Sequence, residues 1–343
     1  MGMYAQRDSI PALDGVRALA ALAVVHGHLP DWAAFMPTAW GGLAVNVFFC
    51  LSGFLITRGL LANRGTDDAL LEFWKRRALR ILPPMYIVIA IFAVVRPDWG
   101  TVAAGTYWYN FYAPYDHTLH PLRHTWSLAL EEQFYAVWPL IILFVPKGRA
   151  LKLIACAIVL PAVLVLVYQF ASQTEWRNEV IFRWTPFQIC YLAIGALIAM
   201  FETEVRSRPR RFLLVGTVCI GAGGLIYHFP ALHAGPQYWF WVLLTAPGLF
   251  LVALSLAGLK GLGNAILSFA PLRAIGRTSY GLYLYHLPIF WAFDTETSKT
   301  WEPILWSILL TTVAVSTSWI LIEKPALRLK TAKLGGTAEV SRG

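Results

Sequence analysis

Charged residues are scarce in this chain of 343 residues: Asp, Glu, Lys and Arg together make up 14%, whereas soluble domains carry about a quarter. Hydrophobic residues make up 57%, and no polar stretch between the apolar segments is long enough to fold separately. The shortage of charge excludes an ordinary soluble enzyme, and the even spread of apolar segments excludes a second, soluble domain. The sequence predicts an all-α, polytopic integral membrane protein.

Acidic residues are fewer than basic ones, 19 against 28, and the net charge is +9. This excess does not indicate nucleic-acid binding, because the basic residues form short groups between apolar segments instead of one patch. Cysteine is limited to four residues, all inside apolar segments, so we expect no disulfide framework.

At about 20 residues per spanning helix, the apolar segments predict about ten transmembrane helices: 11–30, 41–60, 80–96, 125–145, 150–170, 184–202, 212–229, 238–258, 279–294 and 303–322. With the N-terminus inside, the outer loops hold only five of the 28 Lys and Arg residues: Arg96, Arg123, Arg177, Arg183 and Lys299. The positive-inside rule therefore predicts that both termini are cytoplasmic. Residues 1–325 form one membrane domain, and 326–343 form a short basic cytoplasmic tail that we expect to be disordered.

Arg17 and His28 stand eleven residues apart in the first apolar segment. Eleven helical residues make about three turns and about 16 Å, so the two side chains share a face at different depths. A cation near one membrane edge and an imidazole deeper on the same face indicate a reaction path. His26 points to another side of the helix, so the two histidines cannot chelate one metal. The alternative is that either histidine is an interfacial residue near the outer headgroups.

Glu131 and Glu132 lie about two turns into the predicted span 125–145. Adjacent carboxylates in a membrane span are costly unless they are paired or face a wet cavity, so they are typical of a functional site. We expect Glu131 at nearly the depth of His28. The alternative is that the span begins after Gln133 and that both glutamates are surface groups.

Arg77 and Arg80 are three residues apart, which places two planar donors on one helical face, a geometry suited to phosphate. The alternative is an ordinary juxtamembrane anchor. His286, within the span 279–294, is expected to be buried and partnered. The histidines of the outer loop lack a cysteine or carboxylate at ligand spacing, so no metal site is predicted.

Six motifs in a fixed order then connect these residues: 13–17 with His28, 45–56, 73–77 with Pro83, 126–128 with Tyr135, 279–286 and 322–325. Each motif is weak alone, but their order is specific, and they cover almost the whole chain. The chain resembles the membrane acyltransferase-3 family, the bacterial O-acetyltransferases of polysaccharides, lipopolysaccharide O-antigen, nodulation factors and some macrolides. Asn46 departs from the family pattern, which often has aspartate there.

This resemblance implies a ten-helix domain in the bacterial cytoplasmic (inner) membrane, with no permanently bound cofactor. It implies acyl-coenzyme A, most often acetyl-coenzyme A, as the cytoplasmic donor and a carbohydrate or glycolipid hydroxyl as the acceptor. Polysaccharide-assembly proteins are candidate partners. No esterase-like domain follows the last span, so transfer is expected to finish in the membrane domain or on a separate protein.

We expect two catalytic residues: His28 as general base on the acceptor hydroxyl, and Glu131 to orient the imidazole or bind the acceptor. Donor phosphates are expected to bind Arg77 and Arg80, with Arg17 assisting. Contacts to the substrate are expected from Asn46, Trp126, Glu132, Tyr135 and His286. An acyl-histidine intermediate stays open, as does the identity of the acceptor. The same residues also suit a transporter or flippase that makes no bond, and a structural subunit is a third alternative.

Overall fold

The computed structural model describes residues 9–37, 39–171, 177–228 and 237–332, and all regular secondary structure in these ranges is helical, without a β-strand. Long apolar segments become helices because a backbone in lipid must satisfy its hydrogen bonds internally. Eight helical stretches in the described ranges are long and apolar enough to cross a membrane. The chain is therefore a multi-pass, all-α membrane protein, as predicted.

The eight stretches are α2 (Ala39–Ala62), α3 (Ala69–Val95), α6 (Thr125–Phe144), α7 (Lys147–Ala171), α8 (Arg177–Arg183) with α9 (Thr185–Met200), α11 (Pro209–His228), α12 (Gln237–Gly258), and α16 (Trp301–Ser318) continued by α17 (Lys324–Ala332). The other two expected spans are shorter: α1 (Pro11–His26) has 16 residues and α15 (Ser279–Ala292) has 14. Neither reaches the roughly 20 residues that a span requires. Eight of the about ten expected spans therefore meet the length of a spanning helix, and α1 and α15 are shorter.

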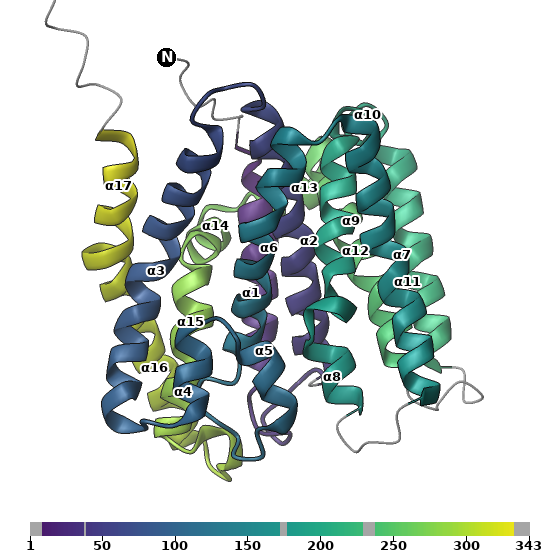
Figure 1. Ribbon diagram of the computed structural model, residues 1–343. Coiled ribbons are helices and arrows are strands. Elements are labelled where there is room, and N and C mark those ends of the chain that lie inside the picture. The colour runs from purple at the N-terminus through teal and green to yellow at the C-terminus, as the bar shows by residue number, and fades with distance from the viewer. Residues whose placement is uncertain (1–8, 38, 172–176, 229–236, 333–343) are drawn as a thin grey trace, which may run out of the picture.

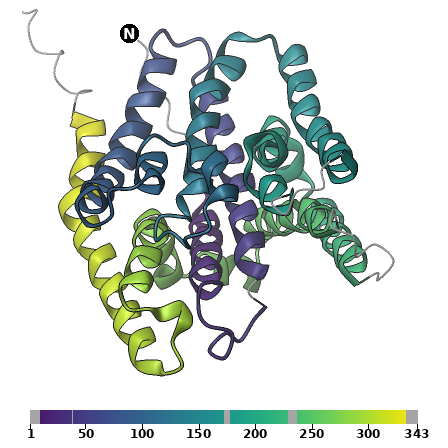
Figure 2. The same cartoon turned by 60° about the horizontal axis from the view of Figure 1, so that its bottom comes forward.

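Short elements gather at the two ends of the bundle (Figure 1). Elements α10 (Glu202–Ser207), α13 (Leu262–Leu267) and α17 lie at one end, and α4 (Trp99–Gly105), α5 (Tyr109–Tyr112) and α8 lie at the other. Figure 2 shows α16 and α17 along one edge and the α11–α12 pair toward the opposite edge, with α1 between them. Helix α1 therefore runs through the interior, where its polar face can line an enclosed site.

Glycines hold α1 tightly against its neighbours. A Cβ on Gly15 would lie 2.0 Å from the carbonyl oxygen of Leu267 in α13, and one on Gly276 in α14 (Ala270–Arg277) would lie 1.8 Å from that of Asp14. Contacts this close are possible only without side chains, a common device between membrane helices. They set the position of α1 and, with it, the positions of Arg17 and His28.

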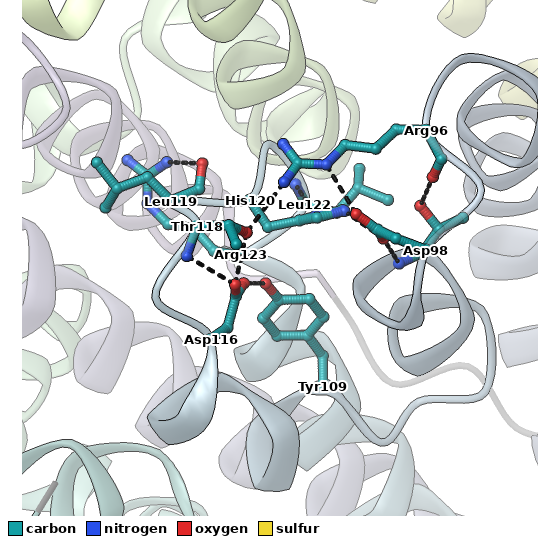
Figure 3. Close-up of polar contacts among 10 residues, drawn as sticks. Arg96, Asp98, Tyr109, Asp116, Thr118, Leu119, His120, Leu122 and Arg123 are labelled. Atoms are coloured by element: carbon teal, nitrogen blue, oxygen red, sulfur yellow. Dashed lines mark hydrogen bonds and ion pairs between the residues drawn. The ribbon is translucent and has the colours of Figure 1, made fainter.

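At the end that holds α4 and α5, ion pairs and hydrogen bonds brace the connection from α3 to α6 (Figure 3). Asp98 caps α4 by accepting from the Thr101 N–H at 3.0 Å, and it accepts from Arg96 Nε at 2.7 Å and His120 Nε2 at 3.0 Å. Burial opposes ionisation of Asp98, but these bonds outweigh it and hold the pKa of the carboxyl below its usual value. Burial lowers the pKa of His120, and Asp98 only partly offsets this.

A second carboxylate, Asp116, completes this brace. It accepts from the Tyr109 hydroxyl and from the N–H and hydroxyl of Thr118, at 3.0 and 2.6 Å, while Arg96 Nη2 donates to the same Thr118 hydroxyl at 3.0 Å. The pKa of Asp116 is also low, because these bonds overcome the effect of burial. We call this set of contacts, within residues 96–120, the loop brace.

The predicted disordered tail begins in a helix instead. Helix α17 extends to Ala332 and packs against α3. This packing keeps the start of the tail helical, although its basic composition had suggested disorder. The last part of the tail, 333–343, lies outside the described residues.

Candidate functional site

Two neighbouring cavities enclose most of the predicted site residues. The smaller, of about 90 Å³, is the arginine cavity, and its charged lining residues come from α1, α3 and α6: Arg17, Arg77, Arg80, Glu131 and Glu132. The lining contains three guanidinium groups and two carboxyl groups. The structure thus brings together the three arginines that were predicted to bind donor phosphates.

Aromatic rings orient the central arginine of this cavity. The Arg77 guanidinium carbon lies 5.7 Å from the ring centre of Phe73 and 5.6 Å from that of Tyr135. Such cation–π contacts hold the planar group without using its N–H donors. Those donors are therefore available to an anion that enters the cavity.

Glu131 belongs to the arginine cavity and is held by hydroxyl groups. Ser52 Oγ donates to one carboxylate oxygen at 2.7 Å, and the Tyr135 hydroxyl donates to the other at 2.9 Å. The described contacts of the His28 ring do not include Glu131. The expected orienting contact from Glu131 to the imidazole is therefore not made, because the carboxylate is directed to α2 and to its own helix.

The larger cavity, of about 510 Å³, is the histidine cavity. Its polar and aromatic lining residues are His28, Arg123, His124, Trp126, Glu179, Phe182, Arg183 and Tyr283. A space of this size accommodates a sugar ring. Trp126, predicted to contact substrate, lies here, with its ring 5.9 Å from that of Phe49 and 5.3 Å from that of Phe182.

His286 and a main-chain carbonyl hold the His28 ring. His28 Nδ1 lies 2.9 Å from the Val24 carbonyl oxygen and 3.3 Å from His286 Nε2. His286 Nδ1 lies 2.7 Å from the Tyr283 carbonyl oxygen, which can only accept, so this nitrogen carries hydrogen. Neutral His286 then accepts at Nε2, and His28 must donate from Nδ1.

This chain of bonds determines the state of the other His28 nitrogen. With hydrogen on Nδ1, the neutral ring has an unprotonated Nε2, and no hydrogen bond to Nε2 occurs within the described part of the chain. His28 lines the histidine cavity. The arrangement supplies a proton acceptor whose ring is fixed from behind.

His26 is directed elsewhere, as the helical spacing predicted. Its Nε2 accepts from the Phe35 N–H at 3.0 Å, and its ring packs against the Phe35 ring at 4.2 Å between centres. It lines neither cavity. Only one of the two neighbouring histidines can therefore serve the site.

Two residues predicted to contact substrate, Asn46 and His286, lie outside the linings of both cavities. Asn46 is fully buried and donates to the Gly42 carbonyl at 3.0 Å, and neither cavity includes it. Val45 lines both cavities, and one residue along a helix turns the side chain by about 100°. His286 is also fully buried, behind His28 and beside His124, so it supports the site instead of lining it.

Val45 and Tyr283 line both cavities and so mark the boundary between them. The Tyr283 hydroxyl donates to the His124 carbonyl at 2.9 Å and also contacts the Ser127 hydroxyl. Glu132 and Tyr135, the remaining predicted substrate contacts, lie on the arginine side of this boundary. The two predicted functions of the site, charge and proton transfer, thus occupy adjoining spaces.

Sequence reasoning missed several lining residues, above all Arg123, Arg183 and Tyr283. A signal existed for the arginines, since they are two of only five Lys and Arg residues in the predicted outer loops. Nothing in the spacing of Tyr283 separates it from the other aromatic residues of α15.

Comparison with known proteins shows which family this chain resembles. The profile of a family described as an acyltransferase domain matches residues 10–323. The chain is 29% identical to the putative peptidoglycan O-acetyltransferase YrhL of Bacillus subtilis, over 92% of this chain and 54% of that protein. It is 26% identical to the O-acetyltransferase OatA of Staphylococcus aureus, over 94% of this chain and 58% of that protein.

The peptidoglycan O-acetyltransferase OatA of Listeria monocytogenes is 28% identical, over 93% of this chain and 56% of that protein. The chain thus spans little more than half the length of these curated relatives. No solved structure matches it.

Proposed function

The chain belongs to the acyltransferase-3 family of membrane proteins, and from this premise we propose that it transfers an acetyl group from acetyl-coenzyme A to a hydroxyl of a cell-wall carbohydrate. The names of its relatives support O-acetyl transfer and a peptidoglycan-like acceptor. The observation that carries the proposal is the His28 ring, which lines a cavity of sugar size and whose Nε2 has no hydrogen-bond partner among the described residues.

The donor binds from the end that carries the arginine cavity. Arg77 and Arg80 contact the phosphates of coenzyme A, and Arg17 adds charge from α1. Arg17 lies in α1 and His28 in the turn that follows this helix. At a helical rise, their separation of eleven residues corresponds to about 16 Å, which suits the extended arm that carries the thioester. Donor charge is thereby held on one side of the boundary at Val45 and Tyr283, with the thioester directed toward the other.

The transfer step uses His28 as a general base. Nε2 takes the proton of the acceptor hydroxyl as its oxygen attacks the thioester carbon, a new C–O bond forms, and the C–S bond breaks. The leaving thiolate takes the proton back from the imidazolium. His286 accepts a hydrogen bond from His28 Nδ1. This bond keeps the hydrogen of His28 on Nδ1 and leaves His28 Nε2 unprotonated at the start of each cycle.

A bond-formation assay tests this function. The purified chain in lipid nanodiscs would receive acetyl-coenzyme A, labelled in the acetyl group, and soluble peptidoglycan fragments. We expect free coenzyme A thiol and acetylated fragment to form in equal amounts. A protein that moves acetyl groups or glycans without making a bond would leave the thioester intact, and that result would reject the proposal.

A further inference from the structure

Two guanidinium groups line the same cavity as the proposed base, and the chemistry assigned so far does not use them. Arg123 precedes α6 and Arg183 ends α8, so they reach the histidine cavity from separate elements. We propose that the acceptor is an anionic carbohydrate, whose carboxylate or phosphate is bound by Arg123 and Arg183 while a hydroxyl of the same molecule meets His28. This inference rests on the proposed function and specifies its acceptor.

Arg123 and Arg183 have N–H donors that their existing partners do not use. Arg183 Nη2 lies 2.7 Å from a Glu179 carboxylate oxygen, and Arg123 pairs with Glu296 and approaches the Leu119 carbonyl at 3.5 Å. A guanidinium has five N–H donors, so these partners leave most of them unused. The Arg183 Nε is buried without a hydrogen-bond partner among the described residues.

The existing carboxylates hold the arginines in place without closing the cavity. Side-chain exposure is 21% for Arg183 but 50% for its partner Glu179, and Glu296 does not line the cavity at all. The carboxylates therefore approach from the rim and from behind. A planar anion entering the cavity can meet the remaining edges of the guanidinium groups, the geometry that favours carboxylate and phosphate.

The surroundings suit a sugar that carries such a charge. Trp126, Phe182 and Tyr283 present aromatic surfaces in the same cavity, which can pack against the apolar faces of a sugar ring. Both arginines lie within electrostatic range of His28. A bound anion would offset their positive charge beside the ring that must accept a proton.

The position of these arginines in the sequence strengthens the inference. The predicted outer loops contain five Lys and Arg residues, whereas the opposite side holds nearly all the others. Two of these five converge on one cavity from positions 60 residues apart in the chain. Topology does not call for cations on this side, so their convergence indicates a ligand of opposite charge.

Acceptor kinetics test the inference with sugars matched in shape. The purified chain in nanodiscs, with saturating acetyl-coenzyme A, would receive N-acetylmuramic acid, its neutral primary amide, N-acetylglucosamine and N-acetylglucosamine 1-phosphate. We expect the KM of at least one charged sugar to lie about tenfold or more below that of its neutral counterpart. The pair with the larger difference shows whether carboxylate or phosphate is the recognised group.

Variants then locate the recognition. Arg123→Gln with Arg183→Gln should bring the charged and neutral KM values within about twofold of each other, while the rate with the neutral amide persists and shows that the variant is folded. Lys299→Gln, which removes an exposed outer-loop charge away from the cavity, should keep the full preference. Glu179→Gln should keep or enlarge it, because Arg183 loses a competing partner.

Equal KM values for charged and neutral sugars in the unaltered protein would overturn the inference, as would a preference that survives in the double arginine variant. Acylation of none of the four sugars, with thioester consumption that still depends on His28, would overturn the anionic acceptor and leave the proposed function standing. Absence of thioester consumption would reject both.

Discussion

The arginine cavity and the histidine cavity adjoin each other but are built on opposite principles. The arginine cavity is small, about 90 Å³, and concentrates five charged side chains from α1, α3 and α6. The histidine cavity is more than five times larger and combines two imidazole rings and aromatic surfaces with only three charged side chains: Arg123, Glu179 and Arg183. The comparison suggests a division of labour, in which the arginine cavity binds the donor through its charge and the histidine cavity brings a neutral base to the acceptor.

The two cavities also differ in how their main titratable groups are hydrogen-bonded. Both oxygens of Glu131 in the arginine cavity are bonded to hydroxyl groups, so this carboxylate is satisfied within the protein. His28 is bonded only through Nδ1 in the described contacts, and its second nitrogen is left for a ligand. A satisfied group supports structure, whereas an unsatisfied one in a cavity of polar character is suited to chemistry.

Removal of His28 from the histidine cavity should have the largest effect on the rate of acetyl transfer. We expect His28→Ala to lower the rate of acetyl transfer by about 10²- to 10⁴-fold, the usual contribution of a general base. The measurement is the initial rate of acetylated product from acetyl-coenzyme A. His26→Ala is the matched control, since its ring packs on Phe35 outside both cavities. A comparable loss of rate in both variants would show that the substitutions disturb the end of α1, and would contradict the role of His28 as the base.

Loss of the arginine pair should affect the donor instead. We expect Arg77→Gln with Arg80→Gln to raise the KM for acetyl-coenzyme A by about 10- to 100-fold, because each hydrogen bond to a charged group is worth about 1.5–3 kcal/mol. The acceptor KM should change little. Arg76→Gln is the control, because Arg76 pairs with Glu72 at 2.6 Å and lines neither cavity. An unchanged donor KM in the double variant contradicts the assignment.

Replacement of His286 should lower the rate by about tenfold while both KM values stay near normal, because supporting residues act through the group they orient. His286→Asn keeps an acceptor for the His28 hydrogen, whereas His286→Phe removes it. We expect the pH dependence of kcat to shift in the Phe variant and to be partly restored in the Asn variant. If both variants lose activity equally with an unaltered pH profile, His286 serves packing alone.

The loop brace lies outside both cavities and should show the smallest effect. His120, Asp98 and Asp116 all have lowered pKa values, so the unfolded segment binds more protons than the folded one as the pH falls. The brace should therefore loosen below about pH 6.5 through His120 and further below about pH 4 through the carboxyls. Hydrogen exchange of residues 96–120 measures this. Increased protection at low pH would contradict it, and Asp98→Asn should reduce the dependence.

Much of the fold could be predicted because a bilayer leaves few choices. Apolar length predicted eight of the ten expected spans well, since lipid enforces helices wherever a long apolar segment occurs. The expected spans at α1 and α15 are shorter helices of 16 and 14 residues, because apolar composition alone does not fix where a helix ends. Helical spacing also predicted that Arg17 and His28, but not His26, would face the site.

The sequence by itself determined a multi-pass helical protein, its family motifs, and the residue types from which a phosphate site and a base could be made. Only the tertiary structure decided which partner fixes the imidazole, because His286 follows His28 by 258 residues and meets it at 3.3 Å through helix packing. It also removed Asn46 from the cavities and brought Arg123 and Arg183 into one of them. Spacing along one helix specifies a face, but contacts between helices depend on how whole elements pack, which no local pattern encodes.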